Sequence, residues 1–203
     1  MKKIIDIFYR DERFLNEILI NKEYERCFND LVIIDIGANI GTFSLYTYNK
    51  TRITYAIEPA RENVEFLEQT KKENKLDKIK IFEMAICGDD KELKLKKNGE
   101  AGKGGWCLKE NGTIKVKIKT LAEFMNDEKI DFVDILKIDV EGNEKEIFQA
   151  SDFPEASKRI STIFGELHQS LGEDQARTLL EKLNFRFKAY KDQLFIAKKI
   201  WKK

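Results

Sequence analysis

The sequence predicts an α/β fold built on a mostly parallel sheet that ends in an antiparallel hairpin. The first observation is the run LVIIDI at residues 31–36, which is short, almost continuously apolar and rich in β-branched side chains. Such a run is typical of a strand buried on both faces. The second is the alternation of strand-like runs with segments of helical spacing, which indicates βαβ units. The third is the pair of adjoining strand-like segments at 185–190 and 193–198.

The other elements follow in chain order from the same two periods. Apolar side chains at helical spacing in residues 4–28 predict one or two helices, and thus an N-terminal helical cap over residues 1–30. Further strands are expected at 52–57, 78–82, 132–138 and 160–164. Helices are expected at 41–49, 60–74, 143–150 and 174–183. Strand and helix therefore alternate along the chain, apart from one insertion.

That insertion spans residues 89–119 and has a different character. Segments 92–97 and 106–119 alternate polar with apolar residues, and they are joined through a glycine-rich stretch and the pair Asn111-Gly112, which predicts an antiparallel β-ribbon. On the predicted fold the ribbon lies over the ligand edge of the sheet and could cover an active site. Lys103 and Trp106 are its candidate substrate contacts, although Trp106 could equally anchor the ribbon, and the ribbon's lysines fit a solvated face.

Composition limits the class of protein. With 203 residues, 42% of them hydrophobic, the chain can bury one core, so we expect a single domain over residues 1–203. Its 37 basic and 36 acidic residues nearly cancel, which disfavours a nucleic-acid partner. No run approaches the roughly 20 apolar residues of a membrane span, and the three cysteines lack the spacing of a zinc or redox motif. We therefore expect a cytoplasmic protein with reduced thiols.

A glycine-rich turn follows the first strand. Gly37 and Gly41 allow the main chain to approach a ligand closely, and the next helix directs its first N–H groups toward the same edge. The dinucleotide fingerprint needs glycines where this chain has Asn39 and Thr42, so NAD and FAD are disfavoured. No phosphate-binding loop of the Gly-Lys-Ser/Thr kind is present. The turn predicts a ligand that is not rich in phosphate.

Acidic side chains end the predicted strands. Glu58, about 20 residues beyond the glycine turn, could accept hydrogen bonds from both hydroxyls of a ribose. Asp139 and Glu141 end a later strand, although each alone could merely cap the following helix. Glu166 and His168, the only histidine, end the next one. Carboxyl ends of parallel strands share one edge, so these groups are expected to gather at a single site.

Four of these groups are candidates for a general base: Asp139, Glu141, Glu166 and His168. The histidine has the intrinsic pKa that best suits a base at neutral pH. A carboxylate would need burial or a like-charged neighbour to become a better base, and clustering would supply that shift. The cluster could also hold a divalent cation through oxygen ligands, but no spacing demands one, and we predict a metal-independent site.

Taken together, the motifs resemble the FkbM family of class I S-adenosylmethionine-dependent methyltransferases. Three stretches carry the resemblance: Asp35-Ile36-Gly37-Ala38-Asn39-Ile40-Gly41, Ala56-Ile57-Glu58-Pro59, and Lys137-Ile138-Asp139-Val140-Glu141-Gly142 with Glu144. They correspond to the family's cofactor loop, its ribose acid and its fourth-strand signature. The resemblance covers roughly residues 31–168 and implies a Rossmann-like methyltransferase sheet.

The resemblance also implies a cofactor and an activity. S-adenosyl-L-methionine would be the donor and S-adenosyl-L-homocysteine the product, and the implied reaction is O-methylation of a sugar hydroxyl in a glycan or glycosylated natural product. The implied cofactor contacts are Asp35, Gly37, Ala38, Asn39, Gly41, Thr42, Phe43, Glu58, Met84, Ala85 and Asp139. Two stretches depart from the family's pattern: Glu83-Met84-Ala85 lacks a polar residue near the adenine, and Thr120-Leu121-Ala122-Glu123 lacks an aspartate.

Other functions stay open at this point. A methyltransferase acting on RNA or protein would be supported by the lysine-rich ribbon, whereas the absence of an Asn-Pro-Pro-Tyr-type tetrapeptide argues against methylation of exocyclic amines. A module that binds the cofactor without catalysis is a third possibility. The acceptor is expected to be a carbohydrate or small molecule with a hydroxyl group. The oligomeric state, and whether the chain is a domain of a larger glycan-processing enzyme, are left open.

Overall fold

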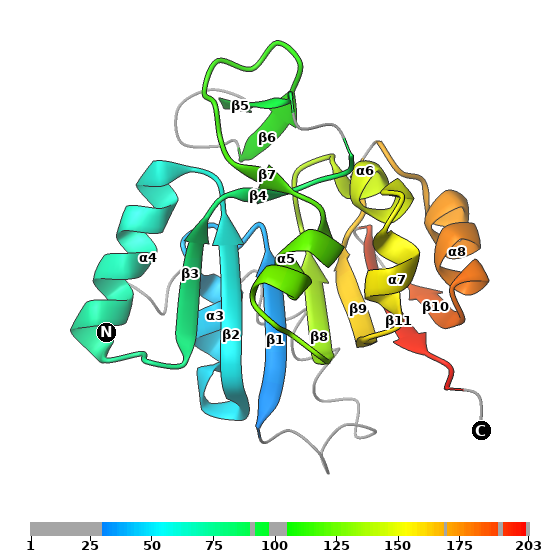
Figure 1. Cartoon of the computed structure of the whole chain (residues 1–203), viewed down its shortest axis with the longest axis horizontal. Helices are drawn as coiled ribbons and strands as arrows, with labels where there is room; N and C mark the ends of the chain where they lie inside the picture. Colours follow the sequence, from blue (N-terminus) through cyan, green and yellow to red (C-terminus); the bar gives the residue numbers. More distant parts are fainter. Residues whose placement is uncertain (1–29, 90–91, 98–104, 169, 191–192, 202–203) are drawn as a thin grey trace.

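The computed structural model describes residues 30–89, 92–97, 105–168, 170–190 and 193–201. The predicted helical cap falls almost entirely on residues 1–29, outside the described residues, as does Lys103. Figure 1 shows a central sheet with helices in front of it and behind it and a small ribbon above one edge. Among the described residues, no helix is long and apolar enough to cross a membrane.

Seven strands form the central sheet, in the order β10-β11-β9-β8-β1-β2-β3. Their bounds are β1 Leu31–Ile36, β2 Thr51–Glu58, β3 Ile79–Glu83, β8 Val133–Ile138, β9 Ile160–Glu166, β10 Phe185–Ala189 and β11 Leu194–Lys199. The pairs from β3 to β9 are parallel, while β11 runs antiparallel to both β9 and β10. The predicted parallel sheet with a C-terminal antiparallel hairpin is confirmed.

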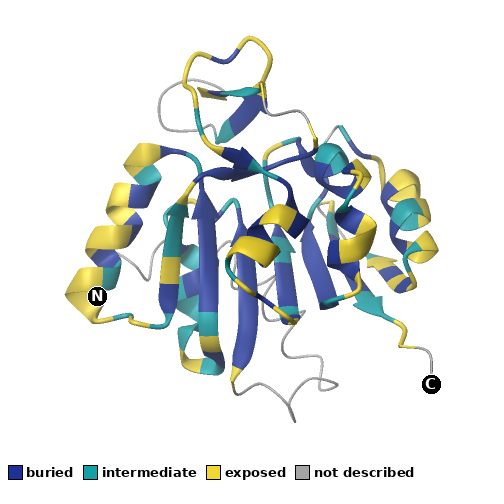
Figure 2. Cartoon of the chain, viewed as in Figure 1, coloured by how far each residue is buried: buried dark blue, intermediate teal, exposed yellow. Residues whose placement is uncertain are grey.

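Helices cover both faces of this sheet. Alternate residues of β1 point to opposite faces, so Ile34 joins one apolar cluster and Ile33 another. The larger cluster includes side chains of α5 Leu121–Asp127, α6 Glu144–Gln149, α7 Phe153–Ser157 and α8 Glu173–Lys182. The opposite face packs against α3 Thr42–Thr47, which continues into the short 3-10 helix η1 Tyr48–Lys50, and against α4 Arg61–Asn74. Figure 2 shows the central strands as the buried layer.

Two of these helices were not predicted. Helix α5 begins with a capping box, in which the Thr120 hydroxyl accepts from the Glu123 N–H and the Glu123 carboxylate accepts from the Thr120 N–H. This pattern of Thr and Glu three residues apart was present in the sequence and predicts a helix start. Helix α7 carries Pro154 in its first turn, where proline is well tolerated.

The insertion is a shorter ribbon than predicted. Strands β5 Lys94–Lys97 and β6 Trp106–Lys109 pair antiparallel, as expected. The segment 106–119 is not one strand: the chain turns at the Asn111-Gly112 pair, where the Gly112 N–H donates to Lys109 O at 3.1 Å. A Cβ at Gly112 would lie 2.2 Å from Lys94 O, so the chains approach closely there.

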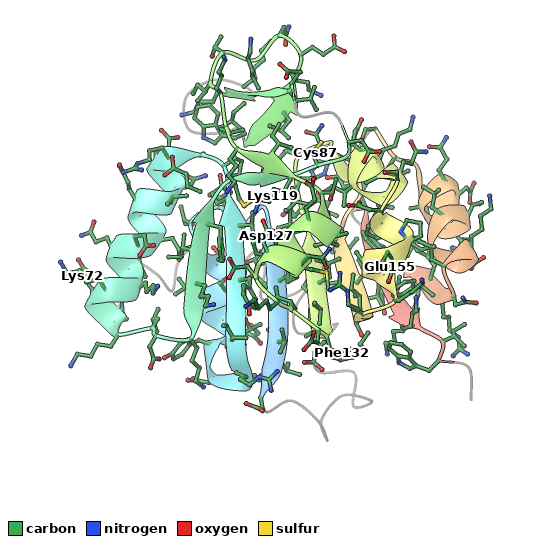
Figure 3. The ribbon with its side chains drawn as sticks, in the orientation of Figure 1. Lys72, Cys87, Lys119, Asp127, Phe132 and Glu155 are labelled. Carbon is green, nitrogen blue, oxygen red and sulfur yellow. The ribbon has the colours of Figure 1, made fainter. Side chains whose placement is uncertain are left out.

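The last part of the insertion belongs to another small sheet. Strand β7 Ile118–Lys119 pairs in parallel with β4 Ala85–Ile86, directly after β3. An ion pair between Lys119 and Asp127 joins β7 to α5, and both residues are labelled in Figure 3. The ribbon is therefore tied at its base to the edge of the sheet at which β1, β2 and β3 end (Figure 1).

Candidate active site

A cavity of about 920 Å³ opens where β1, β2, β8 and β9 end. Its sheet side includes the turn after β1, the last residue of β2 and the residues that follow β8. Its other side includes ribbon residues Leu95, Trp106 and Leu108. The amide N–H of Leu108 donates to Asn143 Oδ1 at 3.1 Å, which links the ribbon to the start of α6. The insertion therefore forms one wall of the cavity, where the sequence placed it.

The glycine turn brings main chain against main chain. Gly37 has a φ of +73°, and a Cβ there would lie 1.8 Å from Asp139 O, so no other residue fits without a shift. The N–H groups of Gly37 and Ala38 both donate to Ile57 O at 3.0 Å. This turn is thus pinned between the ends of β2 and β8, with Gly37, Ala38, Asn39, Thr42 and Phe43 on the cavity wall.

Glu58 ends β2 inside this wall and is only 4% exposed. One carboxylate oxygen accepts from Asn39 N at 2.8 Å, and the other accepts from Ala60 N at 2.9 Å and Asn63 Nδ2 at 3.2 Å. Burial raises the pKa of Glu58, and the two backbone donors partly offset that rise. These bonds hold the carboxylate in one orientation and leave acceptor capacity for a ligand, since an ionised carboxylate offers about four lone-pair sites.

Two predicted cofactor residues lie elsewhere. Asp35 is fully buried and does not line the cavity; its Oδ2 accepts from Ser44 Oγ of α3 at 2.7 Å, and its Oδ1 lies 3.2 Å from Lys137 Nζ. Gly41, with a φ of +88°, caps α3 and packs against Leu67, also away from the cavity wall. Both residues support the turn from behind.

Met84 and Ala85 follow β3 and line the same cavity. Both are buried, and the amide N–H of Ala85 is used by Lys117 O at 2.8 Å. The amide N–H of Met84 lies 3.0 Å from Phe82 O and 3.3 Å from Glu58 O. This side of the cavity is therefore apolar, because the N–H groups of Met84 and Ala85 already donate to other main-chain groups.

The four candidate bases gather at the far side of the cavity. Asp139, Glu141 and His168 can bring one ligand atom each within 4.8 Å of one another, a spacing at which they could share a cation. His168 Nε2 lies 3.7 Å from Glu141 Oε2 and 3.9 Å from Glu166 Oε1. The three carboxylates line the cavity, whereas His168 stands behind them. The ends of β8 and β9 therefore lie close together, as predicted.

His168 does not have the protonation state expected of a base. Its Nδ1 lies 2.7 Å from Oε1 of Glu144, a carboxylate with no exposed surface. This hydrogen bond, helped by the charges of Glu144, Asp139 and Glu141, raises the pKa of His168 to about 9 against the effect of burial. At neutral pH the imidazole is therefore a cation, so the argument from its intrinsic pKa does not apply.

Glu144 is held as the anion that this cation needs. Burial would raise the pKa of Glu144, but the hydrogen bond from His168 and main-chain donors brings it below its ordinary value. Those donors include Gly142 N at 3.2 Å and Val140 N at 3.3 Å. The first turn of α6 thereby fixes the histidine ring from behind the cavity.

Glu141 and Glu166 shift in the direction a base requires. Burial is the main cause that raises the pKa of each, and the negative charge of Asp139 adds to it. The positive charge of His168 acts in the opposite sense on both. Burial, together with the crowding of carboxylates anticipated from the sequence, thus raises the proton affinity of these two groups.

Lys137 is a further residue of the site, to which the sequence analysis gave no role beyond membership of the fourth-strand signature. It lines the cavity, and its Nζ lies 2.8 Å from Gly37 O, 3.2 Å from Asp35 Oδ1 and 3.7 Å from Asp139 Oδ2. A lysine within an otherwise apolar strand, VDILKI, was the available signal. Buried cations are rare unless paired, so a lysine in such a run points to an acidic partner.

Trp106 both anchors the ribbon and lines the cavity. Its Nε1 donates to Glu62 Oε1 of α4 at 3.2 Å, and Lys97 Nζ contacts the same oxygen at 3.1 Å. Lys97 also lies over the indole, 5.1 Å from the ring centroid. The two roles expected as alternatives for Trp106 are therefore compatible in one geometry.

Comparison with known protein families decides the family of the chain. Residues 35–187 match the model described as the methyltransferase FkbM domain. The chain belongs to the FkbM methyltransferase family. It is therefore an S-adenosylmethionine-dependent methyltransferase, and the matched range contains the glycine turn, Glu58 and the whole acidic cluster.

One relative of this FkbM domain is similar in sequence, and two solved structures are similar in fold. "Methyltransferase 1" of Beauveria bassiana is 25% identical over 196 residues, which cover 83% of this chain and 78% of the relative. The FkbM methyltransferase of Methylobacillus flagellatus superposes with a TM-score of 0.54 at 14% identity, over 83% of this chain and 43% of the other. The magnesium protoporphyrin IX methyltransferase of Synechocystis gives a TM-score of 0.58 at 10% identity, over 98% and 83%.

Proposed function

We propose that this FkbM domain is an O-methyltransferase whose acceptor is a hydroxyl group of a carbohydrate or a similar polyhydroxylated small molecule. The observation that carries this proposal is the pair Glu141 and Glu166, two half-buried carboxylates with raised pKa values on the wall of the cofactor cavity. Ionised carboxylates accept hydrogen bonds from hydroxyl groups and can remove their protons.

The residues on the wall fit S-adenosylmethionine. A volume of about 920 Å³ accommodates a nucleoside together with an acceptor, within the usual range of small-molecule sites. Glu58 would hold the ribose hydroxyls, the turn at Gly37, Ala38 and Asn39 would pass along the ligand, and Met84 with Ala85 would face the adenine. Bound S-adenosylmethionine supplies an electrophilic methyl group on its sulfonium sulfur.

The chain's own task is to align the acceptor oxygen with that methyl carbon. Glu166 is our candidate for the base, because it is the last residue of β9 and pairs with Leu194 of β11, which fixes its backbone. Glu141 instead lies in the turn after β8, with a φ of +54°, and is not on a paired strand. The hydroxyl proton would pass to a carboxylate oxygen of Glu166 as the oxygen attacks, contributing about 10²–10⁴-fold.

His168 would act as a positioning cation rather than a base. Held by Glu144, its imidazolium faces the carboxylates of Glu141 and Glu166 across 3.7 and 3.9 Å. This charge limits the repulsion among carboxylates that would otherwise protonate them or push them apart. It also supplies, from within the chain, the positive charge that a metal ion would bring to such a cluster.

Two features support a saccharide over a larger acceptor. Several carboxylates close together can accept from neighbouring hydroxyls of one ring. Trp106, on the cavity wall, offers an aromatic face of the kind that packs against a sugar. The insertion's exposed lysines favour RNA as the second candidate. Among the described residues these are Lys96, Lys97, Lys109, Lys115 and Lys117.

Transfer of a labelled methyl group tests the proposal. The protein is incubated with labelled donor and, separately, with deoxysugar-containing glycans, RNA and peptides. We expect label in the glycan fraction, retained after mild base treatment that cleaves methyl esters. Labelling of RNA alone, abolished by added salt, would replace the proposal with the second candidate. Donor binding with no transfer to any acceptor would favour a module without catalysis.

A further inference from the structure

Three lysines form one row across the ribbon, on three neighbouring segments of the chain. Lys94 of β5 lies directly opposite Lys109 of β6 in the antiparallel register. On its other side, β5 is joined to the later segment by the antiparallel bridge between Leu95 and Ile114, which places Lys94 opposite Lys115 as well. Directly opposite side chains share one face and are about 5 Å apart, so this lysine row spans about 10 Å.

The lysine row lies on the face of the ribbon that points away from the cavity. Leu95 and Leu108, the chain neighbours of Lys94 and Lys109, are buried and line the cavity. Side chains alternate between the two faces of a strand, so the lysines point outward. Lys109 and Lys115 are exposed, and Lys94 is half-buried. An anion on the row would be separated from the cavity by the ribbon alone.

The charges of the row are not compensated. In the part of the chain that the structure describes, none of the three lysines has an ion pair. Lysines elsewhere have one, such as Lys97 with Glu62 and Lys158 with Glu155. Like charges directly opposite each other destabilise an antiparallel pair. The row is therefore locally unfavourable, and a bound anion would remove the repulsion.

Protection of sheet edges is the competing explanation, because lysines on edge strands discourage pairing with other chains. It accounts for Lys109 and Lys115, which lie on the two outer segments of the ribbon. It does not account for Lys94, because β5 has partners on both sides. On one side it pairs with β6, and on the other the Leu95 N–H donates to Ile114 O at 2.8 Å.

We propose that the lysine row is a docking surface for an anionic glycan, whose phosphate or carboxylate groups bind Lys94, Lys109 and Lys115 while a neutral sugar of the same molecule enters the cavity. This inference rests on the proposed function, because it names the class of acceptor for that site. A row of about 10 Å contacts more than one anionic group, which favours an oligosaccharide over a single small anion.

Two observations favour a glycan over RNA as the anionic partner. Proteins that bind single-stranded RNA stack its bases on aromatic side chains, but Trp106, the only aromatic residue of the insertion, lies two residues from Leu108 and thus on the cavity face. RNA also carries a phosphate at every nucleotide, which would meet the carboxylates of Asp139, Glu141 and Glu166 in the cavity. A glycan can carry charge on some of its units and present a neutral ring to those carboxylates.

Binding is tested by fluorescence anisotropy with four labelled probes of equal length. They are neutral dextran, dextran carrying phosphate groups, dextran carrying carboxymethyl groups, and an oligouridylate. We expect the wild type to bind at least one of the two anionic dextrans about 10-fold more tightly than neutral dextran, and more tightly than the RNA. Added salt should weaken this binding. The anionic dextran that binds more tightly identifies the anionic group.

The triple variant Lys94→Gln, Lys109→Gln, Lys115→Gln removes the charges of the row. It should weaken binding of the anionic dextran about 10-fold, as expected for three exposed charge pairs. Its affinity for S-adenosylhomocysteine should be unchanged, because none of the three lysines lines the cavity. A triple variant that binds the anionic dextran as tightly as the wild type would overturn the docking surface.

The matched control removes the same charge elsewhere. Lys72→Gln, Lys182→Gln, Lys188→Gln changes three exposed lysines on α4, α8 and β10, and it should bind like the wild type. An equal loss in this control, or a wild type that does not prefer anionic over neutral dextran, would overturn the docking surface. Methyl transfer to a neutral glycan would then still support the proposed function. Tighter binding of the oligouridylate than of either dextran would replace the glycan with RNA.

A measurement on the wild type covers the case in which the triple variant does not fold. Neutralising the row should stabilise the ribbon, so saturating anionic dextran should slow hydrogen exchange at Leu95 N, which donates to Ile114 O. Neutral dextran should leave this exchange rate unchanged. If the anionic dextran binds but exchange at Leu95 stays the same, the glycan binds elsewhere on the molecule.

Discussion

The only histidine of the chain owes its charge to a single buried carboxylate. Glu144 is fully buried on the first turn of α6, where main-chain N–H groups keep it ionised, and it holds His168 Nδ1 at 2.7 Å. The pairing places a cation behind Glu141 and Glu166. Residue chemistry alone favoured His168 as the base, and the neighbour that reverses this assignment lies 24 positions away in the sequence.

The pKa of His168 can be read directly, because no other histidine contributes to the spectrum. We expect the imidazole signals to titrate at about 9 in the wild type and to shift toward 6.5 or below in Glu144→Gln. Measurement is by ¹H–¹⁵N NMR of the imidazole between pH 5 and 10. A wild-type titration near 6.5 would contradict the pairing and restore His168 as a candidate base.

The same pair makes stability depend on pH. Because the folded pKa of His168 lies above its ordinary 6.5, the stabilisation is fully present below pH 6.5 and is lost as the pH rises through about 9. At about 1.4 kcal/mol per pKa unit, the full effect is roughly 3 kcal/mol. Urea unfolding at pH 6 and pH 9.5 should therefore show a larger loss in the wild type than in His168→Gln. An equal loss of unfolding free energy in the wild type and in His168→Gln would refute this contribution of the His168–Glu144 pair.

The base itself is tested by a charge-removing substitution. Glu166→Gln should lower kcat about 10²–10⁴-fold without changing the affinity for S-adenosylhomocysteine. Since the pKa of Glu166 is raised by burial, wild-type activity should increase with pH as that carboxylate ionises, and E166Q should lack this limb. Glu141→Gln is the matched comparison. Loss of kcat in E141Q but not in E166Q would assign the base to Glu141.

At the scale of elements, the strands that are buried in the sheet could be predicted from the sequence. Strand β1 is buried along its whole length, and such a strand is recognisable as a continuous apolar run. Every strand of the main sheet was predicted to within a few residues. Helix α5 was not predicted, although Thr120 and Glu123 have the spacing of a capping box. Alternation runs through residues 106–119, but strand β6 ends at Lys109, and the chain turns at Asn111-Gly112 before Ile114 pairs with Leu95.

The residues of the site also fall into those that the sequence could predict and those that it could not. Strand-end residues could be predicted because parallel topology brings their carboxyl ends to one edge, as for Glu58 and Asp139. Roles that depend on side-chain direction could not. Asp35 points toward α3 and Lys137 rather than into the cavity, and Glu144 owes its importance to a contact with His168.

Gly112 controls the ribbon as an element. A Cβ there would come 2.2 Å from Lys94 O and 2.5 Å from Lys94 C, both backbone atoms that cannot move aside. Gly112→Ala should therefore break the ribbon locally, with faster hydrogen exchange at Leu95 N, which donates to Ile114 O. Amides of the central sheet should keep their protection. Gly172→Ala, where nothing lies within 4 Å, is the control. Unchanged exchange at Leu95 would contradict the close approach.

At the scale of the whole molecule, the site brings together the sheet, α4 and the ribbon. The sheet supplies carboxylates and the glycine turn, α4 supplies Glu62 as an anchor, and the ribbon supplies Trp106. A ligand that fills this cavity would touch the sheet and the ribbon at once. Binding should therefore stabilise the ribbon together with the sheet, and the effect should be visible in global unfolding.

Thermal unfolding with S-adenosylhomocysteine measures that coupling. A ligand at 100 times its dissociation constant stabilises the native state by about 2.7 kcal/mol, which for a chain of this size raises Tm by about 5–10 °C. Glu58→Gln should lose most of this shift, because the amide cannot accept from two ribose hydroxyls as a carboxylate does. Gly112→Ala should keep a smaller shift, since the ribbon wall is disrupted while the sheet wall is intact. A full shift in E58Q would place the nucleoside away from β2, because the carboxylate at its tip would then contribute nothing to binding.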